Sequence, residues 1–160
     1  MDRPPTPAQQ DAARKTLVAW LQTTLRDNPV VDGAGPDTEE PERRWYLRVR
    51  GEDKDVFTIW FTLDQRTLAY ESYVLAAPEE NQAAVYEQLL RRNRGLYGPS
   101  FSIGSEDAIF LTGRMDLDHV DDESLDHLLG TIYATVEQSF RALLRLGFAT
   151  RLAAAERGSG

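Results

Sequence analysis

Acidic residues and both histidines of the chain gather in residues 116–127, DLDHVDDESLDH, and such side chains could bind a metal ion. Oxygen ligands suit calcium, and imidazoles suit transition metals. The spacing does not fit a calcium loop counted from Asp116, because position six is Asp121 instead of glycine and position twelve is His127 instead of glutamate. The chain also has no HExxH motif and no cysteine. We therefore predict no metal site, with weak cation binding as the alternative. The acids are interpreted as a helix start, where the helix dipole favours negative charge.

Other catalytic motifs are missing from the sequence as well. Residues 98–102 read GPSFS and break the GxSxG nucleophile elbow at its last position. There is no Walker phosphate-binding loop and no GxGxxG dinucleotide motif. The acids single out no pair for general acid–base catalysis, and Glu71, on an expected strand, is interpreted as facing water. The sequence thus predicts no catalytic residue, no cofactor and a protein that is not an enzyme.

Positive charge is concentrated in one place, the run RRNR at residues 91–94. The end of a helix explains this run, because the helix dipole stabilises cations there. A contact with a phosphate or an acidic peptide is the alternative. The whole chain has a net charge of −8, which argues against direct binding to nucleic acid or to an anionic membrane. That charge favours a basic protein as a partner.

The strongest structural signal is the stretch 122–149, DESLDHLLGTIYATVEQSFRALLRLGFA. Apolar residues recur in it at three- and four-residue steps, so they fall on one stripe of a helix that lies on a core. The stripe consists of Leu125, Leu128, Leu129, Ile132, Tyr133, Val136, Phe140, Leu143 and Leu144. We expect the rest of the chain to be arranged around this helix.

The elements before this helix alternate helices with hairpins. Helical spacing over residues 7–26 follows a Thr6–Gln9 capping box. Alternating apolar residues predict the other elements: strands near 45–50, 56–63 and 68–75, a helix over about 78–93, and strands at 100–103 and 108–115. The short connections between strands predict antiparallel pairing.

The order α-βββ-α-ββ-α predicts an α+β fold with a single five-stranded, mainly antiparallel sheet packed with helices. We expect one domain over residues 1–160, with an ordered core of about 7–150. Residues 27–43, rich in Pro, Gly and acid, are expected to form a mobile loop, and residues 152–160 a frayed tail. No apolar run is long enough to span a membrane, and the first residues lack the apolar segment of a secretory signal. We therefore expect a cytoplasmic protein with no membrane contact.

The expected strand at 56–63 carries apolar or neutral side chains on both faces. One face then packs on the helices and the other can meet a second copy or a peptide, unless both are covered within the monomer. The last helix, about 42 Å long, also exceeds a five-stranded sheet about 24 Å wide, and this overhang favours a homodimer. The predicted protein-binding or dimer surface consists of Tyr46, Trp60, Tyr70, Tyr73, Tyr133, Phe140 and Leu144.

The segments VYEQLLRRNRGLYG, IFLTGRM and LDHLLGTIYATVEQSF make residues 44–149 similar to the YbjN family of bacterial sensory-transduction regulators. That family has the fold of type III secretion chaperones. The resemblance implies this fold, a homodimer that binds other proteins, and no established catalytic site. It names no partner, because structural kinship does not fix function.

Our first hypothesis is a non-enzymatic, dimeric, chaperone-like adaptor that holds a partner protein or an extended peptide. The alternative is a stress-response or regulatory factor that acts through a nucleic-acid-associated protein. A third hypothesis, a small-ligand sensor or enzyme, requires a deep pocket with convergent polar groups.

Overall fold

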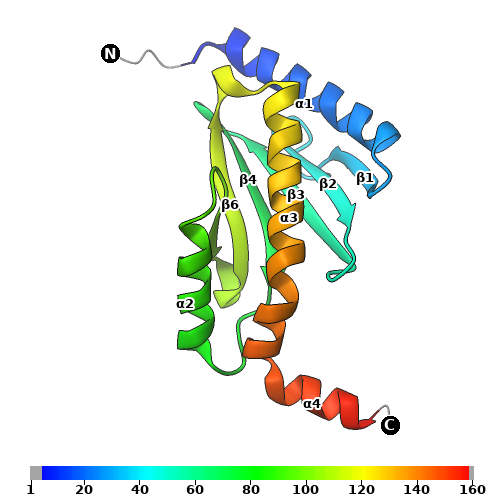
Figure 1. The fold of residues 1–160 in the computed structure, drawn as a ribbon. Coiled ribbons are helices and arrows are strands. Elements are labelled where there is room, and N and C mark those ends of the chain that lie inside the picture. The colour runs from blue at the N-terminus through cyan, green and yellow to red at the C-terminus, as the bar shows by residue number, and fades with distance from the viewer. Residues whose placement is uncertain (1–4, 159–160) are drawn as a thin grey trace.

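Helices and hairpins follow one another in the predicted order, with one added strand and one added helix (Figure 1). The computed structural model describes residues 5–158. The helices are α1 (Pro7–Asp27), α2 (Gln82–Asn93), α3 (Asp122–Gly147) and α4 (Ala149–Gly158). The strands are β1 (Val31–Pro36), β2 (Arg44–Arg50), β3 (Val56–Leu63), β4 (Thr67–Leu75), β5 (Ser100–Ile103) and β6 (Ile109–Asp116). The α+β class is confirmed, and the sheet has six strands instead of the expected five.

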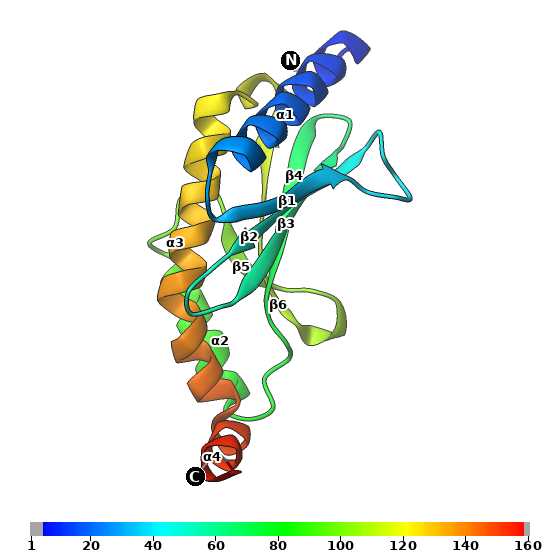
Figure 2. The same ribbon diagram turned by 90° about the vertical axis from the view of Figure 1, so that its right-hand side faces the viewer.

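The six strands form one sheet in the order β1-β2-β3-β4-β6-β5, and every neighbouring pair is antiparallel. Figure 2 shows helices on one side of this sheet, and no helix among residues 5–158 covers the other side. Side chains alternate along a strand, so each inner strand sends every second residue into the core. The burial of Trp45, Leu47 and Val49 on β2 follows this rule.

β1 corrects the expectation of a mobile loop over all of residues 27–43, which is wrong for Val31–Pro36. The segment reads VDGAGP and lacks the alternation of large apolar residues that predicts a strand. It pairs with β2 through its backbone, from Val31 opposite Val49 to Pro36 opposite Trp45, with a bulge near Gly33. Because β1 is an edge strand, its proline and its bulge are tolerated.

α3 lies across the covered face of the sheet and supplies much of the core (Figures 1 and 2). It begins as predicted after Asp121, whose Oδ1 accepts the Ser124 N–H at 2.7 Å. This backbone hydrogen bond, with a smaller contribution from the Ser124 side chain, lowers the pKa of the Asp121 carboxyl. Most of the predicted stripe is buried, namely Leu125, Leu128, Leu129, Ile132, Val136 and Leu143. These buried residues belong to the hydrophobic core, which agrees with the expectation that the rest of the chain is arranged around this helix.

The far end of α3 does not overhang as an unpartnered apolar stripe. The segment before α2 packs against it, so that a Cβ at Gly147 would lie 3.2 Å from Pro78 Cβ and 3.4 Å from Val85 Cγ2. The amides of Glu79 and Glu80 both donate to the Gly147 carbonyl, at 3.0 and 3.1 Å. Coverage within the chain therefore removes the overhang as an argument for a dimer.

Residues after α3 form the helix α4, where the sequence predicts a frayed tail over 152–160. Glu80 holds its first turn, since its carboxylate accepts the Thr150 N–H at 2.6 Å. Arg151 also pairs with Glu79 at 2.8 Å. The prediction of a tail is wrong for the residues up to Gly158, and residues 159–160 lie outside the described part of the chain.

A carboxylate on α3 fixes the turn between β2 and β3. Glu137 accepts the N–H groups of Glu52 and Asp53 at 2.9 and 2.8 Å. A Cβ at Gly51 would overlap this carboxylate and the Lys54 carbonyl, so the turn requires glycine there. This clamp, formed by the Glu137 carboxylate and the two amides, anchors the β2–β3 hairpin to α3.

Glu137→Gln removes the charge and one of the two acceptors of this clamp. We expect it to lower the free energy of unfolding by about 1–3 kcal/mol, because hydrogen bonds to charged groups are the stronger ones. Urea denaturation at neutral pH measures the change. Glu87→Gln is the matched control, since Glu87 makes only an exposed pair with Arg91 at 3.3 Å, worth about 0.5 kcal/mol or less. Equal losses in the two variants would show that the clamp contributes nothing beyond a surface charge.

Candidate functional site

Four aromatic side chains lie side by side on the face of the sheet that no described helix covers. We call this surface the open face; its aromatic residues are Tyr46, Trp60, Tyr73 and Phe110. Tyr46 is paired with Trp60 across β2 and β3, with ring centroids 5.7 Å apart. Tyr73 is paired with Phe110 across β4 and β6, with centroids 5.6 Å apart. Each of them occupies the strand position next to a buried residue, so the pleat places all four on one side.

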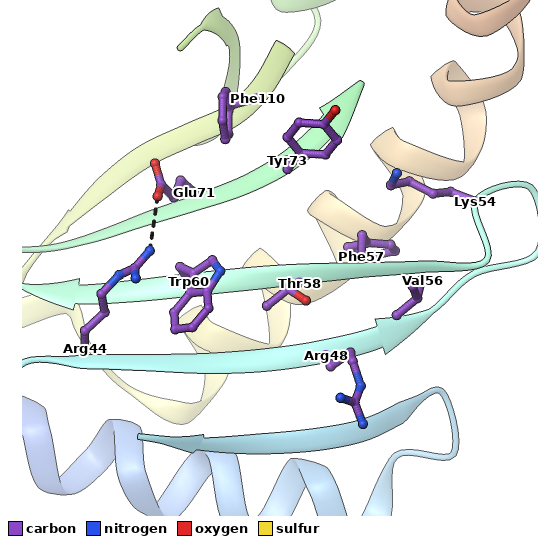
Figure 3. Close-up of a pocket in the computed structure, with 10 residues that line it drawn as sticks. All are labelled: Arg44, Arg48, Lys54, Val56, Phe57, Thr58, Trp60, Glu71, Tyr73 and Phe110. Atoms are coloured by element: carbon purple, nitrogen blue, oxygen red, sulfur yellow. Dashed lines mark hydrogen bonds and ion pairs between the residues drawn. The ribbon is translucent and has the colours of Figure 1, made fainter. Parts of the chain in front are cut away.

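Charged side chains lie near the rings of Trp60, Tyr73 and Phe110 (Figure 3). The Arg44 guanidinium lies 4.0 Å from the centre of the Trp60 ring, a cation–π contact, and 3.5 Å from a Glu71 carboxylate oxygen. Arg48 turns to the β1 side and pairs with Asp32 at 2.7 Å. The open face therefore combines aromatic surface with charges of both signs.

Two shallow hollows mark the middle of the open face. One holds about 330 Å³ and extends from Trp60 to Tyr73 and Phe110, and the other holds about 390 Å³ and extends toward Thr62 and Thr112. Trp60 and Glu71 line both of them, so the two hollows adjoin. This shape fits side chains of another polypeptide better than a small molecule, which needs an enclosing pocket.

Lys54 closes one end of the first hollow (Figure 3). Its Nζ lies 4.8 Å from the centre of the Phe140 ring and 5.6 Å from that of Tyr73. Burial among these groups lowers the pKa of the Lys54 amine, and the nearby Asp55 carboxylate opposes part of that effect.

The residues predicted as a binding surface fall into three groups. Tyr46, Trp60 and Tyr73 come together on the open face, and Tyr73 is 44% exposed. Tyr70 does not belong to it, because it points to the helices and is only 3% exposed. Tyr133, Phe140 and Leu144 are half-buried on α3, packed against the core.

Sequence reasoning missed Phe110, Arg44 and Lys54 on this face. Phe110 could have been found, since it alternates with the apolar residues Ile109 and Leu111 on a predicted strand. No sequence signal places Lys54, because its position depends on the turn that Glu137 holds.

Both histidines line a separate hollow of about 650 Å³ between the start of α3 and residues 97–99. Tyr70 also lines this hollow and lies across Gly113, where a Cβ would overlap the phenol ring. Burial raises the pKa of the Tyr70 hydroxyl. The His119 side chain on the rim is 74% exposed and lies 3.9 Å from Asp116. Among residues 5–158, no three such side chains are close enough together to hold a metal ion.

Of the helices that the structure describes, none combines the length and the apolar character needed to cross a membrane.

Residues 28–145 match the family model YbjN, which is described as "Putative bacterial sensory transduction regulator". The chain belongs to the YbjN family. The matched range covers the whole sheet, all of α2 and all but the last two residues of α3. The likeness to type III secretion chaperones stays a prediction.

Several mycobacterial proteins are similar to the chain. An uncharacterised protein of Mycobacterium tuberculosis is 36% identical over 102 residues, which are 64% of this chain and 56% of that protein. An uncharacterised protein of Mycobacterium leprae is 34% identical over 105 residues, 66% of this chain and 57% of that protein. The chain thus spans little more than half the length of these relatives.

Chemical labelling of Lys54 at different pH values reports on this end of the open face. The lowered pKa predicts a labelling midpoint below the value of about 10.4 for a free lysine. Tyr73→Ala uncovers Nζ, so the midpoint should rise toward the free value. Acetylation with acetic anhydride, read by mass spectrometry of the Lys54 peptide, measures both. An unchanged midpoint in the variant would show that Tyr73 does not shield the amine.

Proposed function

We propose that this YbjN protein is a non-enzymatic, dimeric protein-binding adaptor and that the open face is its contact surface. The observation that carries this proposal is the aromatic surface of Tyr46, Trp60, Tyr73 and Phe110 on a sheet face that no helix within residues 5–158 covers. Aromatic residues and arginine are enriched at protein interfaces, where they supply large contact area at low entropic cost.

The size of the open face supports a protein as the occupant. The eight residues of β3 extend roughly 26 Å, and six strands extend roughly 24 Å. The flat area is on the order of 600 Å² before the relief of the side chains is added, which approaches the roughly 800 Å² per partner of a standard interface.

The charges on the open face support a second copy of the chain as one occupant. A two-fold contact brings the same patch together from both molecules, so it needs a self-complementary surface. Arg44 and Arg48 on β2 and Glu71 on β4 supply both signs within one patch. Ion pairs at the surface contribute little to stability, so these residues can replace their ion pairs within the chain by ion pairs to a second copy at little cost in free energy.

A regulatory role fits the same surface. The description of the YbjN family names sensory transduction, and a regulator without catalytic residues acts by binding. The net charge of −8 favours a basic partner, including a nucleic-acid-associated protein, over nucleic acid itself. The adaptor hypothesis and the regulator hypothesis thus use the same contact surface and differ only in the partner that binds there.

Tyr73→Glu tests the contact surface by placing a charge in it. We expect the wild-type chain to sediment as a dimer at micromolar concentration and the variant to dissociate at least about tenfold more readily, because burying the new carboxylate costs desolvation free energy that the nearby Lys54 offsets only in part. Sedimentation velocity over a concentration series measures this.

Tyr97→Glu is the matched control for this experiment. Tyr97 is 87% exposed and lies outside the open face, so the same substitution should leave the sedimentation unchanged. A monomeric wild-type chain, or equal behaviour of the two variants, would contradict the proposed dimer contact.

A further inference from the structure

The arginine run at residues 91–94 divides into side chains with different surroundings. Arg91 pairs with Glu87, one turn back on α2, at 3.3 Å. Arg94 is exposed just after the last turn of α2. Arg92 differs from both, because it turns toward α3 and lines a hollow there.

This hollow lies between α2 and α3 and has a volume of about 460 Å³. Gln88 and Arg92 line it from α2, and Arg145 lines it from α3 together with Ala142, Leu143 and Leu146. Helix packing thus brings two guanidinium groups, far apart in the sequence, to one partly apolar hollow.

Neither guanidinium is neutralised within the described chain. Arg92 and Arg145 form no ion pair with another residue of the range 5–158, although nine other arginines do. Arg92 Nε is moreover the one buried side-chain nitrogen or oxygen in this range without a hydrogen-bond partner. A buried donor without an acceptor is costly, more so on a charged group. An acceptor from outside the chain would remove that cost.

We propose that the hollow between α2 and α3 is a binding site for a phosphate group. Guanidinium groups bind oxyanions through pairs of parallel N–H donors. Arg92, Arg145 and the Gln88 amide supply three sets of donors from two helices, and the three terminal oxygens of a phosphate match them better than the two of a carboxylate. The chain as a whole repels anions at a net charge of −8, so binding depends on these local contacts.

This site is independent of the proposed adaptor function. α2 and α3 cover the sheet face opposite the open face (Figure 2), so a ligand in the hollow does not compete with a protein on the open face. It would link α2 to α3 and stabilise their packing by binding the folded state.

Titration of ¹⁵N-labelled protein with inorganic phosphate at constant ionic strength tests the site. We expect a saturable shift of the Arg92 Nε–H signal, with sulfate producing the same shift and with acetate and chloride producing none. Glycerol 3-phosphate identifies the source of the phosphate, since tighter binding than inorganic phosphate indicates an ester and equal binding indicates the free ion.

Variants at matched positions separate the site from general electrostatics. Arg92→Gln and Arg145→Gln should each weaken phosphate binding at least about tenfold, since each removes charged hydrogen bonds. Arg94→Gln removes the same charge from the same end of α2 and should change the affinity less than about twofold. Arg92→Lys keeps the charge without the Nε donor and should also lose affinity.

Several results would overturn the proposal. They are the absence of a saturable shift, equal shifts with acetate, or an equal loss of affinity in Arg94→Gln. The amide spectra of the variants show whether each is folded, and Arg145→Gln carries the test if Arg92→Gln is not.

Discussion

The packing of α3 across one face of the sheet is the interaction on which the rest of this structure depends. Leu125, Ile132 and Leu143 lie on one stripe of the helix and are fully buried with the inner side chains of β2, β3 and β4. α1 joins the same layer through Trp20. Its ring meets that of Phe61 edge to face, with the ring centroids 6.1 Å apart. With α2 also on this side, every large helix is engaged there. The hydrophobic core is therefore one-sided, and none of the helices in the described part of the chain covers the opposite face of the sheet.

That opposite face does not have the composition of a surface that only meets water. A solvated face of an antiparallel sheet usually carries polar residues, whereas β2, β3, β4 and β6 each place an aromatic ring on it. The rings contact one another in pairs, and Arg44 covers part of Trp60, so the monomer partly shields its own apolar surface. Such a face can stay hydrated when free and still supply contact area when bound, which is the physical basis of the proposed adaptor role.

Much of the fold is predictable from the sequence because its signals are periodic. The stripe of α3, the capping box at Thr6 and the alternating strands β2, β3 and β4 follow from residue spacing alone. β1 is not predictable in this way, since it joins the sheet through backbone pairing and has no apolar alternation. The open face is partly predictable: Tyr46 and Trp60 share a face by parity, whereas Tyr70 follows the opposite parity on β4 and was misplaced as a surface residue. The coverage of the end of α3 by Pro78 and Val85, and the meeting of Arg92 with Arg145, depend on tertiary contacts that no local pattern encodes.

The open face is proposed to become buried when the protein associates. Hydroxyl-radical footprinting of the wild-type chain, dilute and concentrated, tests it most directly, because it reports the exposure of single aromatic side chains. We predict that Trp60 and Tyr73 become protected as the concentration rises while Tyr97 stays reactive. Equal reactivity of Trp60 and Tyr73 at both concentrations, in a sample that sediments as a dimer, would contradict the assignment of the open face as the contact surface.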